Sequence, residues 1–271
     1  MKLYRMAEGF FVEQDGRFFA VEAKSWDELI GGTDLLDRAA KACQGATVTV
    51  DVTRALAPVV GQEVWAAGVT YFRSRSARIE ESKGGGSFYD LVYEAERPEL
   101  FFKSVGGRVI GPGGTVRIRR DATWSVPEPE WTLVINASGD IVGYTIGNDM
   151  SSRDIEGANP LYLPQAKVYD GSCAIGPCIL IADAAMGSTT KIAIEIAREG
   201  RTAFSGNTTL AEMKRDPKDL VEVLYRETSF PVGALLMTGT GIVPPDEFTL
   251  APGDAIRIEI EGIGTLENVV G

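Results

Sequence analysis

Three acidic residues have the types and spacing of a metal site: Glu128 and Glu130 lie one residue apart, and Asp149 follows later in the chain. If the segment from Glu128 onward is a strand, its period of two places both glutamates on one face. Residues 136–140 are typical of a tight turn, and residues 141–146 of a second strand. A two-residue loop would pair position 130 with 149, and a four-residue loop would pair 128 with 149. An odd-length loop would turn Asp149 to the other face.

Converging carboxylates repel one another and raise each other's pKa values unless a cation neutralises them. The ligands here would all be hard oxygens, which favours Mg²⁺, with Mn²⁺ or Ca²⁺ as substitutes, over zinc or copper. The sequence therefore predicts a metal site at Glu128, Glu130 and Asp149. The alternative interpretation is a solvated edge strand, where proline is tolerated and charge protects the edge.

The composition excludes several kinds of active site and partner. The 271 residues include no histidine, which rules out histidine metal ligands and a Ser-His-Asp triad. The net charge of −11 argues against nucleic acid or an anionic membrane as partners, and no apolar run reaches the ~20 residues of a membrane span. The three cysteines have no metal-ligand spacing, which indicates reduced thiols in a cytoplasmic protein.

The chain divides by pattern into two parts. Residues 1–60 are predicted to form a small N-terminal domain, and residues 61–271 a catalytic domain. After Asp149 short β-like segments dominate, separated by turn signals. Strands and helices do not alternate along the chain, so the pattern does not indicate a parallel sheet built from βαβ units. The expected fold is mostly β with a few helices, of the α+β class.

Four further residues could take part in chemistry. A desolvated Lys167 close to a metal could act as a base, although a lysine in an apolar segment also reaches solvent by extending its side chain. Hydroxyls and backbone amides around Thr240 could bind a carboxylate, and a plain β-turn fits equally well. Glu99, Phe101 and Lys103 share one face of a predicted strand, which suits either a pocket wall or an interface.

Five motifs can be compared with known families: Leu100-Phe101-Phe102-Lys103, Glu128-x-Glu130, Asn148-Asp149-x-Ser151-Ser152-Arg153-Asp154, Lys167 with Gly176-Pro177, and Thr238-Gly239-Thr240. Together they resemble the fumarylacetoacetate hydrolase superfamily, over residues 61–268. The resemblance implies a mixed β-sandwich roll and a magnesium ion or similar cation held by Glu128, Glu130 and Asp149.

Within the superfamily, the chain resembles the 2-keto-3-deoxy-D-arabinonate dehydratases nearly from end to end. That resemblance implies a homodimer or homotetramer that dehydrates a small 2-oxo acid to 2,5-dioxopentanoate through a metal-stabilised enolate. The segments that carry it are Met1-Lys2-Leu3-Tyr4-Arg5, Arg97-Pro98-Glu99-Leu100-Phe101-Phe102-Lys103, Pro127-Glu128-Pro129-Glu130, and Glu156-x-x-Asn159-Pro160-Leu161-Tyr162-Leu163-Pro164-Gln165.

The expected roles follow from the chemistry of such a dehydration. Lys167 would take the C3 proton or support the enolate as a cation, and Glu99 would protonate the departing 4-hydroxyl. Arg75, Thr240 and Lys103 would bind the substrate. Decarboxylation, isomerisation and acylpyruvate hydrolysis remain alternatives, because all begin with the same enolate. A sugar-acid-binding protein or a calcium-stabilised structural protein is the non-enzymatic alternative.

Overall fold

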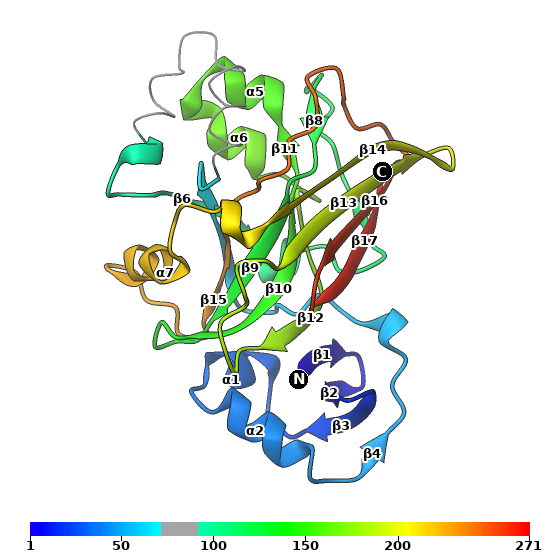
Figure 1. Cartoon of the computed structure of the whole chain (residues 1–271), viewed down its shortest axis with the longest axis vertical. Coiled ribbons are helices and arrows are strands. Elements are labelled where there is room, and N and C mark those ends of the chain that lie inside the picture. Colours follow the sequence, from blue (N-terminus) through cyan, green and yellow to red (C-terminus); the bar gives the residue numbers. More distant parts are fainter. Residues whose placement is uncertain (72–91) are drawn as a thin grey trace.

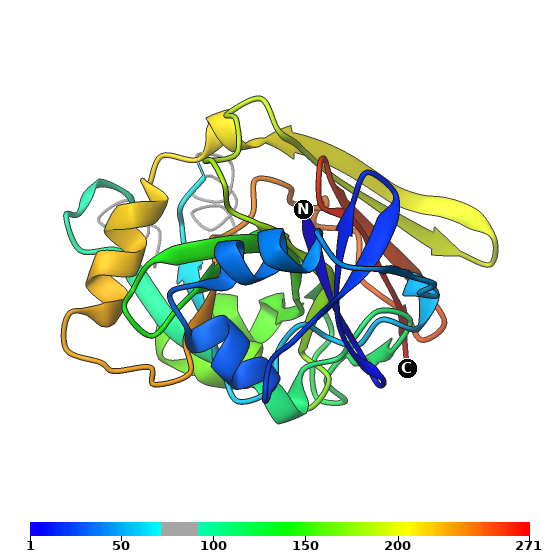
Figure 2. The ribbon, with the colours of Figure 1, turned by 90° about the horizontal axis from the view of Figure 1, so that it is seen from below.

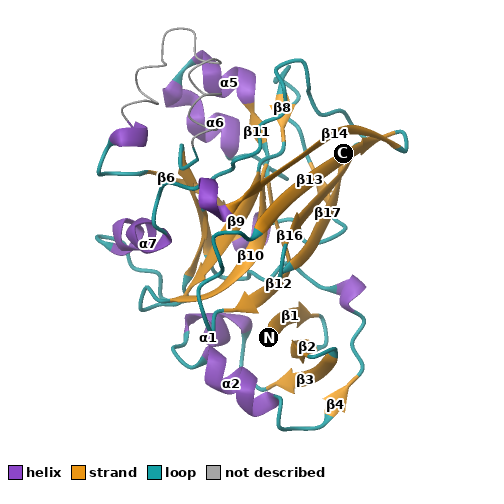
Figure 3. Ribbon diagram, in the orientation of Figure 1, coloured by secondary structure: helices purple, strands orange, loops and turns teal. Residues whose placement is uncertain are grey.

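The structure is a computed structural model of the chain, and it describes residues 1–71 and 92–271 (Figure 1). Strands are the main regular structure of the described chain, with short helices at the ends and sides of the sheets (Figure 3). A ten-stranded sheet and a five-stranded sheet pack around a common apolar core. The mostly β, α+β fold predicted from the sequence is confirmed.

The ten-stranded sheet runs through the whole molecule. It is antiparallel except where β15 pairs in parallel with β5. Its strands, in spatial order, are β4 (Thr47–Val48), β3 (Arg17–Val21), β2 (Gly9–Gln14), β1 (Lys2–Met6), β12 (Cys173–Ile181), β10 (Ile141–Asp149), β9 (Pro129–Ile135), β15 (Ala234–Met237), β5 (Glu63–Gly68) and β6 (Glu99–Val105).

The five-stranded sheet covers one face of the larger sheet. Burial alternates along its inner strands: in β13, Ile192, Ile194 and Ile196 are buried while Lys191 and Glu195 are exposed, as expected for a sheet with one solvated face. The strands in spatial order are β14 (Arg201–Thr209), β13 (Lys191–Arg198), β16 (Ala255–Ile260), β17 (Gly264–Val270) and β7 (Thr115–Val116); β8 (Ser125–Val126) and β11 (Ser151–Ser152) form a separate pair.

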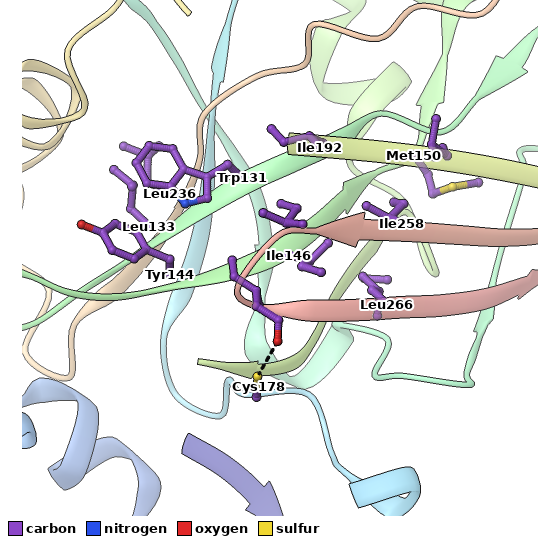
Figure 4. Packing of buried hydrophobic residues seen from close by; sticks show 14 of the residues in the cluster. Trp131, Leu133, Tyr144, Ile146, Met150, Cys178, Ile192, Leu236, Ile258 and Leu266 are labelled. Atoms are coloured by element: carbon purple, nitrogen blue, oxygen red, sulfur yellow. Dashed lines mark hydrogen bonds between the residues drawn. The ribbon is translucent and has the colours of Figure 1, made fainter. Parts of the chain in front are cut away.

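The core between the two sheets is apolar and continuous. Leu133, Ile146, Ile258 and Leu266 all have no exposed surface and belong to one cluster (Figure 4). At one side of the cluster the rings of Trp131 and Tyr144 stack with their centroids 4.9 Å apart. Trp131, Leu133 and Ile135 of β9 face this core. Glu130 and Thr132 alternate with them along the strand and therefore face the opposite side, as does Glu128 just before the strand.

The N-terminal segment extends the large sheet. Strand β1 pairs antiparallel with β12, and β2, β3 and β4 continue outward from it. Helices α1 (Trp26–Gly31) and α2 (Leu35–Ala42) lie beside these strands, at the lower end of the molecule in Figure 1 and in front of the main body in Figure 2. A second apolar cluster joins Leu3, Val12 and Leu29 to Val64 and Val134. The predicted domain boundary near residue 60 stays a prediction.

The β9–β10 hairpin sets the register of the acidic residues. Ile135 pairs with Ile141, so five residues form the connection, an odd number. A β-bulge between Ile141 and Gly143 then adds one residue to β10 and restores an even count. Farther along, Glu128 and Asp149 exchange both backbone hydrogen bonds, at 3.2 and 3.0 Å. The pairing of 128 with 149, one of the two predicted registers, is the one observed.

Short helices cover the end of the sheet where these acids lie. Helices α5 (Arg153–Ala158) and α6 (Leu163–Lys167) follow β11 and lie at the top of the molecule in the view of Figure 1. Helix α7 (Pro217–Tyr225) lies at the side of the sheet, and its Tyr225 hydroxyl donates to the carbonyl of Asn136 at 2.9 Å. Among the described residues no helix has both the length and the apolar character needed to cross a membrane.

The core predicts the result of shortening a central side chain. Leu236 in β15 has no exposed surface, so Leu236→Ala should lower the free energy of unfolding by about 2–5 kcal/mol through lost burial and a cavity. Leu161 is 83% exposed, and Leu161→Ala should change the free energy of unfolding by about 0.5 kcal/mol or less. Urea denaturation of both variants measures the difference; equal effects would contradict the core described above.

Candidate active site

Three carboxylates converge at the end of the β9–β10 hairpin. One oxygen from each of Glu128, Glu130 and Asp149 lies within 4.8 Å of the other two, and all three residues are buried. Their exposed fractions are 3%, 1% and 1%. Strand β9 lies between β10 and β15, so the alternative of a solvated edge strand does not hold. Burial without compensation would be costly for three negative charges, and the surrounding groups must offset it.

The donor set fits a hard divalent cation. All three candidate ligands are carboxylate oxygens, the donors that Mg²⁺ prefers. Asp149 Oδ1 is buried and has no hydrogen bond of good geometry among the described residues, although the ammonium of Lys103 lies 2.5 Å away. Burial and the nearby charges of Asp149 and Glu128 raise the pKa of Glu130 well above its usual range. A bound cation would relieve this repulsion, which supports the predicted metal site.

Two buried cations already balance part of the charge. Lys167 Nζ lies 2.7 Å from Glu128 Oε2 and 2.9 Å from Asp149 Oδ2, and it donates to the Ser151 hydroxyl at 2.6 Å. Arg153 donates to Glu128 Oε1 at 2.6 Å. Lys167 is 1% exposed, so its ammonium does not reach solvent. The attraction between such paired charges offsets part of the cost of taking each of them out of water.

Lys103 lies behind Asp149. It has no exposed surface, and its ammonium donates to the carbonyls of Met150, at 3.1 Å, and of Lys167. The third neighbour of the ammonium is Asp149 Oδ1. Two of the three donors of the ammonium bind backbone carbonyls, and the ammonium also forms an ion pair with Asp149 Oδ1. This position does not suit the substrate contact predicted for Lys103, because the group that would bind substrate faces inward.

Two turns meet at the carboxyl ends of the parallel strands β5 and β15. The Thr70 hydroxyl donates to the carbonyl of Thr238 at 2.5 Å. The Gly239 amide donates to Glu130 Oε2 at 2.6 Å, so a backbone amide of this turn does bind a carboxylate, but the carboxylate belongs to the protein. Gly239 has a φ of +86°, a conformation that favours glycine. Thr240 is the next residue and lines the same pocket.

A small pocket opens onto the acidic cluster. It is lined by the three acids and Lys167, by the turns just described, and by residues of β6, α5 and α6, namely Glu99, Phe101, Glu156 and Leu163. Lys167 Nζ lies 5.9 Å from the centre of the Phe101 ring, within cation–π range. The predicted face of β6 therefore points into a pocket that contains carboxylates, an ammonium and an aromatic ring.

The structure brings together six of the predicted site residues. The three acids, Lys167, Glu99 and Thr240 line this pocket; Lys103 lies behind it, and Arg75 lies outside the described residues. The sequence analysis gave no role to Arg153 or Glu156. Both residues follow Asp149 closely in the chain, and both are buried in α5, which begins at Arg153.

A family model described as "Fumarylacetoacetate (FAA) hydrolase C-terminal" matches residues 78–271. The chain belongs to the fumarylacetoacetate hydrolase family. A protein from Haloferax volcanii called "Probable 2-keto-3-deoxyxylonate dehydratase" is 48% identical over 217 residues, which are 80% of this chain and 74% of that protein. The "2-dehydro-3-deoxy-D-arabinonate dehydratase" of Saccharolobus solfataricus is 41% identical over 213 residues, 77% of this chain and 72% of that protein.

Solved structures agree with this relationship. The structure described as "2-keto-3-deoxy-D-arabinonate dehydratase complexed with magnesium and 2,5-dioxopentanoate" superposes with a TM-score of 0.86 at 33% identity. The superposition covers 100% of this chain and 98% of the chain of the solved structure. The resemblance to the superfamily and the roll-type fold inferred from the sequence are thereby confirmed.

The raised pKa of Glu130 predicts a pH-dependent metal affinity. Without metal, burial and two like charges favour the protonated carboxyl, whereas a cation requires the carboxylate. Mg²⁺ binding should therefore release a proton, and the affinity should fall as the pH is lowered through the raised pKa. Titration calorimetry in buffers of different ionisation enthalpy measures this release.

Glu130→Gln keeps the size of the side chain, but the amide can neither release a proton when Mg²⁺ binds nor offer a negative charge to the ion. It should bind Mg²⁺ more weakly and release fewer protons, whereas the exposed Glu267→Gln should behave as the unaltered protein does. A Glu130→Gln protein with unchanged affinity and proton release would exclude Glu130 as a ligand.

Proposed function

We propose that the chain is a Mg²⁺-dependent hydro-lyase that dehydrates a 2-keto-3-deoxy sugar acid of the 2-keto-3-deoxy-D-arabinonate type to 2,5-dioxopentanoate. The observation that carries the proposal is the buried cluster of Glu128, Glu130 and Asp149 beside Lys167, with Glu99 across the same pocket. The dehydratase names of relatives at 48% and 41% identity support the reaction class.

Glu128, Glu130 and Asp149 would hold the ion, and Mn²⁺ or Ca²⁺ are its proposed substitutes. When bound, Mg²⁺ polarises a 2-oxo acid and lowers the free energy of the enolate that forms on loss of the C3 proton. The protein supplies the rest of the reaction: groups that move protons, groups that orient the substrate and walls that exclude water.

Lys167 is the proposed group for the C3 proton. Its Nζ shares Glu128 and Asp149 with the metal site, so the attraction that holds a proton on Nζ weakens when a divalent cation occupies the same carboxylates. The Ser151 hydroxyl and the face of Phe101 hold the amine in one orientation. Lys167 can thus accept a proton from substrate, or remain charged beside the enolate.

Glu99 is the proposed proton donor to the 4-hydroxyl. It lies in β6 on the pocket wall, two positions from Phe101, and its carboxyl reaches the same space as the acidic cluster. The hydroxyl takes the proton from Glu99 and leaves as water while the C3 proton goes to Lys167. Proton transfers of this kind contribute about 10²–10⁴-fold each. The dehydrated acid then rearranges to 2,5-dioxopentanoate.

The remaining proposals concern substrate binding, the position of Asp149, the cellular location and the oligomeric state. Thr240 and Arg75 are proposed to hold the substrate carboxylate and its distal hydroxyls. We assign Lys103 to holding Asp149 in place, because its ammonium contacts Asp149 Oδ1 and two backbone carbonyls. A cytoplasmic location, which the three free cysteines support, and a homodimer or homotetramer stay predictions.

The decisive experiment is a product assay. The protein should convert a 2-keto-3-deoxy pentonate to 2,5-dioxopentanoate with Mg²⁺ and lose this turnover with a chelator. Oxaloacetate and acylpyruvates serve as comparison substrates, since decarboxylation, tautomerisation or hydrolysis would start from the same enolate. Ligand-dependent stabilisation without any product would instead identify a sugar-acid-binding protein.

Replacing the lysine separates chemistry from metal binding. Lys167→Met keeps the length of the side chain and removes the amine, so kcat should fall by at least about 10²-fold. Mg²⁺ affinity should not fall, because the variant removes a cation that competes for Glu128 and Asp149. Steady-state kinetics and calorimetry measure the two effects. A normal rate would move the proton-transfer role to another residue.

A further inference from the structure

Gly68 and Glu99 are partners across two strands. Gly68 is the last residue of β5, Glu99 is the first of β6, and the two pair directly in the antiparallel ladder. Directly paired residues turn their side chains to the same face of a sheet. Position 68 therefore faces the pocket together with Glu99, and both residues line it.

The carboxyl group of Glu99 occupies the space where a side chain at position 68 would begin. A Cβ atom built on Gly68 would lie 2.6 Å from Glu99 Cδ and would collide with Glu99 Oε2. Carbon atoms that are not bonded to each other do not approach this closely. The Glu99 carboxyl can lie against the backbone of residue 68 only because that residue is glycine.

The backbone at Gly68 is fixed from several sides. Gly68 itself is paired with Glu99 of β6, and the pairing of β5 with β15 on the other edge ends two residues earlier, at Ala66. Beyond Gly68, Val69 is 6% exposed with a φ of +53°, a conformation that is unfavourable for a β-branched residue and persists only where the surroundings impose it. Thr70 then ties the chain to the carbonyl of Thr238. A methyl group at position 68 must therefore displace the flexible end of Glu99, not the backbone.

We propose that Gly68 is a positioning residue that sets where the Glu99 carboxyl meets the substrate. This rests on the proposed function, in which Glu99 gives a proton to the leaving hydroxyl. Gly68 itself contacts no reacting atom; the absence of its side chain reserves the space for the proton donor. The three acids and Lys167 are held by other contacts, so a change at Gly68 leaves metal binding intact.

The test is a double-mutant cycle of Gly68→Ala and Glu99→Ala. Gly68→Ala should lower kcat about 10–100-fold, the loss expected when a catalytic group is misplaced by about 1 Å. KM, the Mg²⁺ affinity and Tm should stay close to those of the unaltered protein. If Gly68 acts through Glu99, the double variant should be no slower than Glu99→Ala alone, because coupled residues are not additive.

Gly107→Ala is the matched control. No atom lies within 4 Å of a Cβ at Gly107, so the same substitution there should leave kcat unchanged. Unchanged kcat in Gly68→Ala, or losses that add in the double variant, would overturn the proposal. If Gly68→Ala fails to fold, Glu99→Ala should restore folding by removing the collision; no restoration would equally overturn it.

The two possible failures are distinguishable. Full turnover in Glu99→Ala would remove Glu99 from the proposed mechanism, and the positioning role of Gly68 with it. A slow Glu99→Ala protein beside a fully active Gly68→Ala protein would leave the proposed function intact and reject the inference about Gly68 alone.

Discussion

The whole site depends on placing three carboxylates in a region that excludes water. Lys167, Arg153 and Lys103 form ion pairs with Glu128 or Asp149 and offset part of the cost of burying these two carboxylates. Glu130 has one amide donor and two like-charged neighbours, and its raised pKa is the result. The ion pairs thus offset part of the cost of burying the acids, and the repulsion that remains between the carboxylates favours the binding of a divalent cation.

Two parts of the fold supply that placement. The β9–β10 hairpin brings the acids together, and its opposite face is anchored by Trp131, Leu133 and Ile146 in the core between the sheets. The parallel pair β5–β15 brings two turns to the same end, one of which carries Gly239. Because β9 lies next to β15, the hairpin and the parallel pair form one continuous surface. Rigid strands fix the acids more accurately than loops would.

The sequence predicted the acids, their common face and the fold class, because alternation and the spacing of Glu128, Glu130 and Asp149 are local properties. It left two registers open, since the bulge in β10 has no sequence signal that short-range rules detect. It placed Lys103 on the correct face of β6 but not at the correct depth. Alternation tells which side of a sheet a residue occupies, whereas tertiary packing decides whether it lines the pocket or lies behind it.

The bulge between Ile141 and Gly143 has a consequence for how this protein can change its length. If a single insertion in residues 136–140 shifted the pairing of β10 by one residue, the two faces of β10 would be exchanged and Asp149 would turn toward the apolar interior. Deleting Val142, the extra residue of the bulge in β10, would shift the pairing in the same way. Lengthening of this connection in evolution or by engineering must therefore be absorbed within the loop, come in pairs of residues, or be accompanied by a compensating irregularity in a strand.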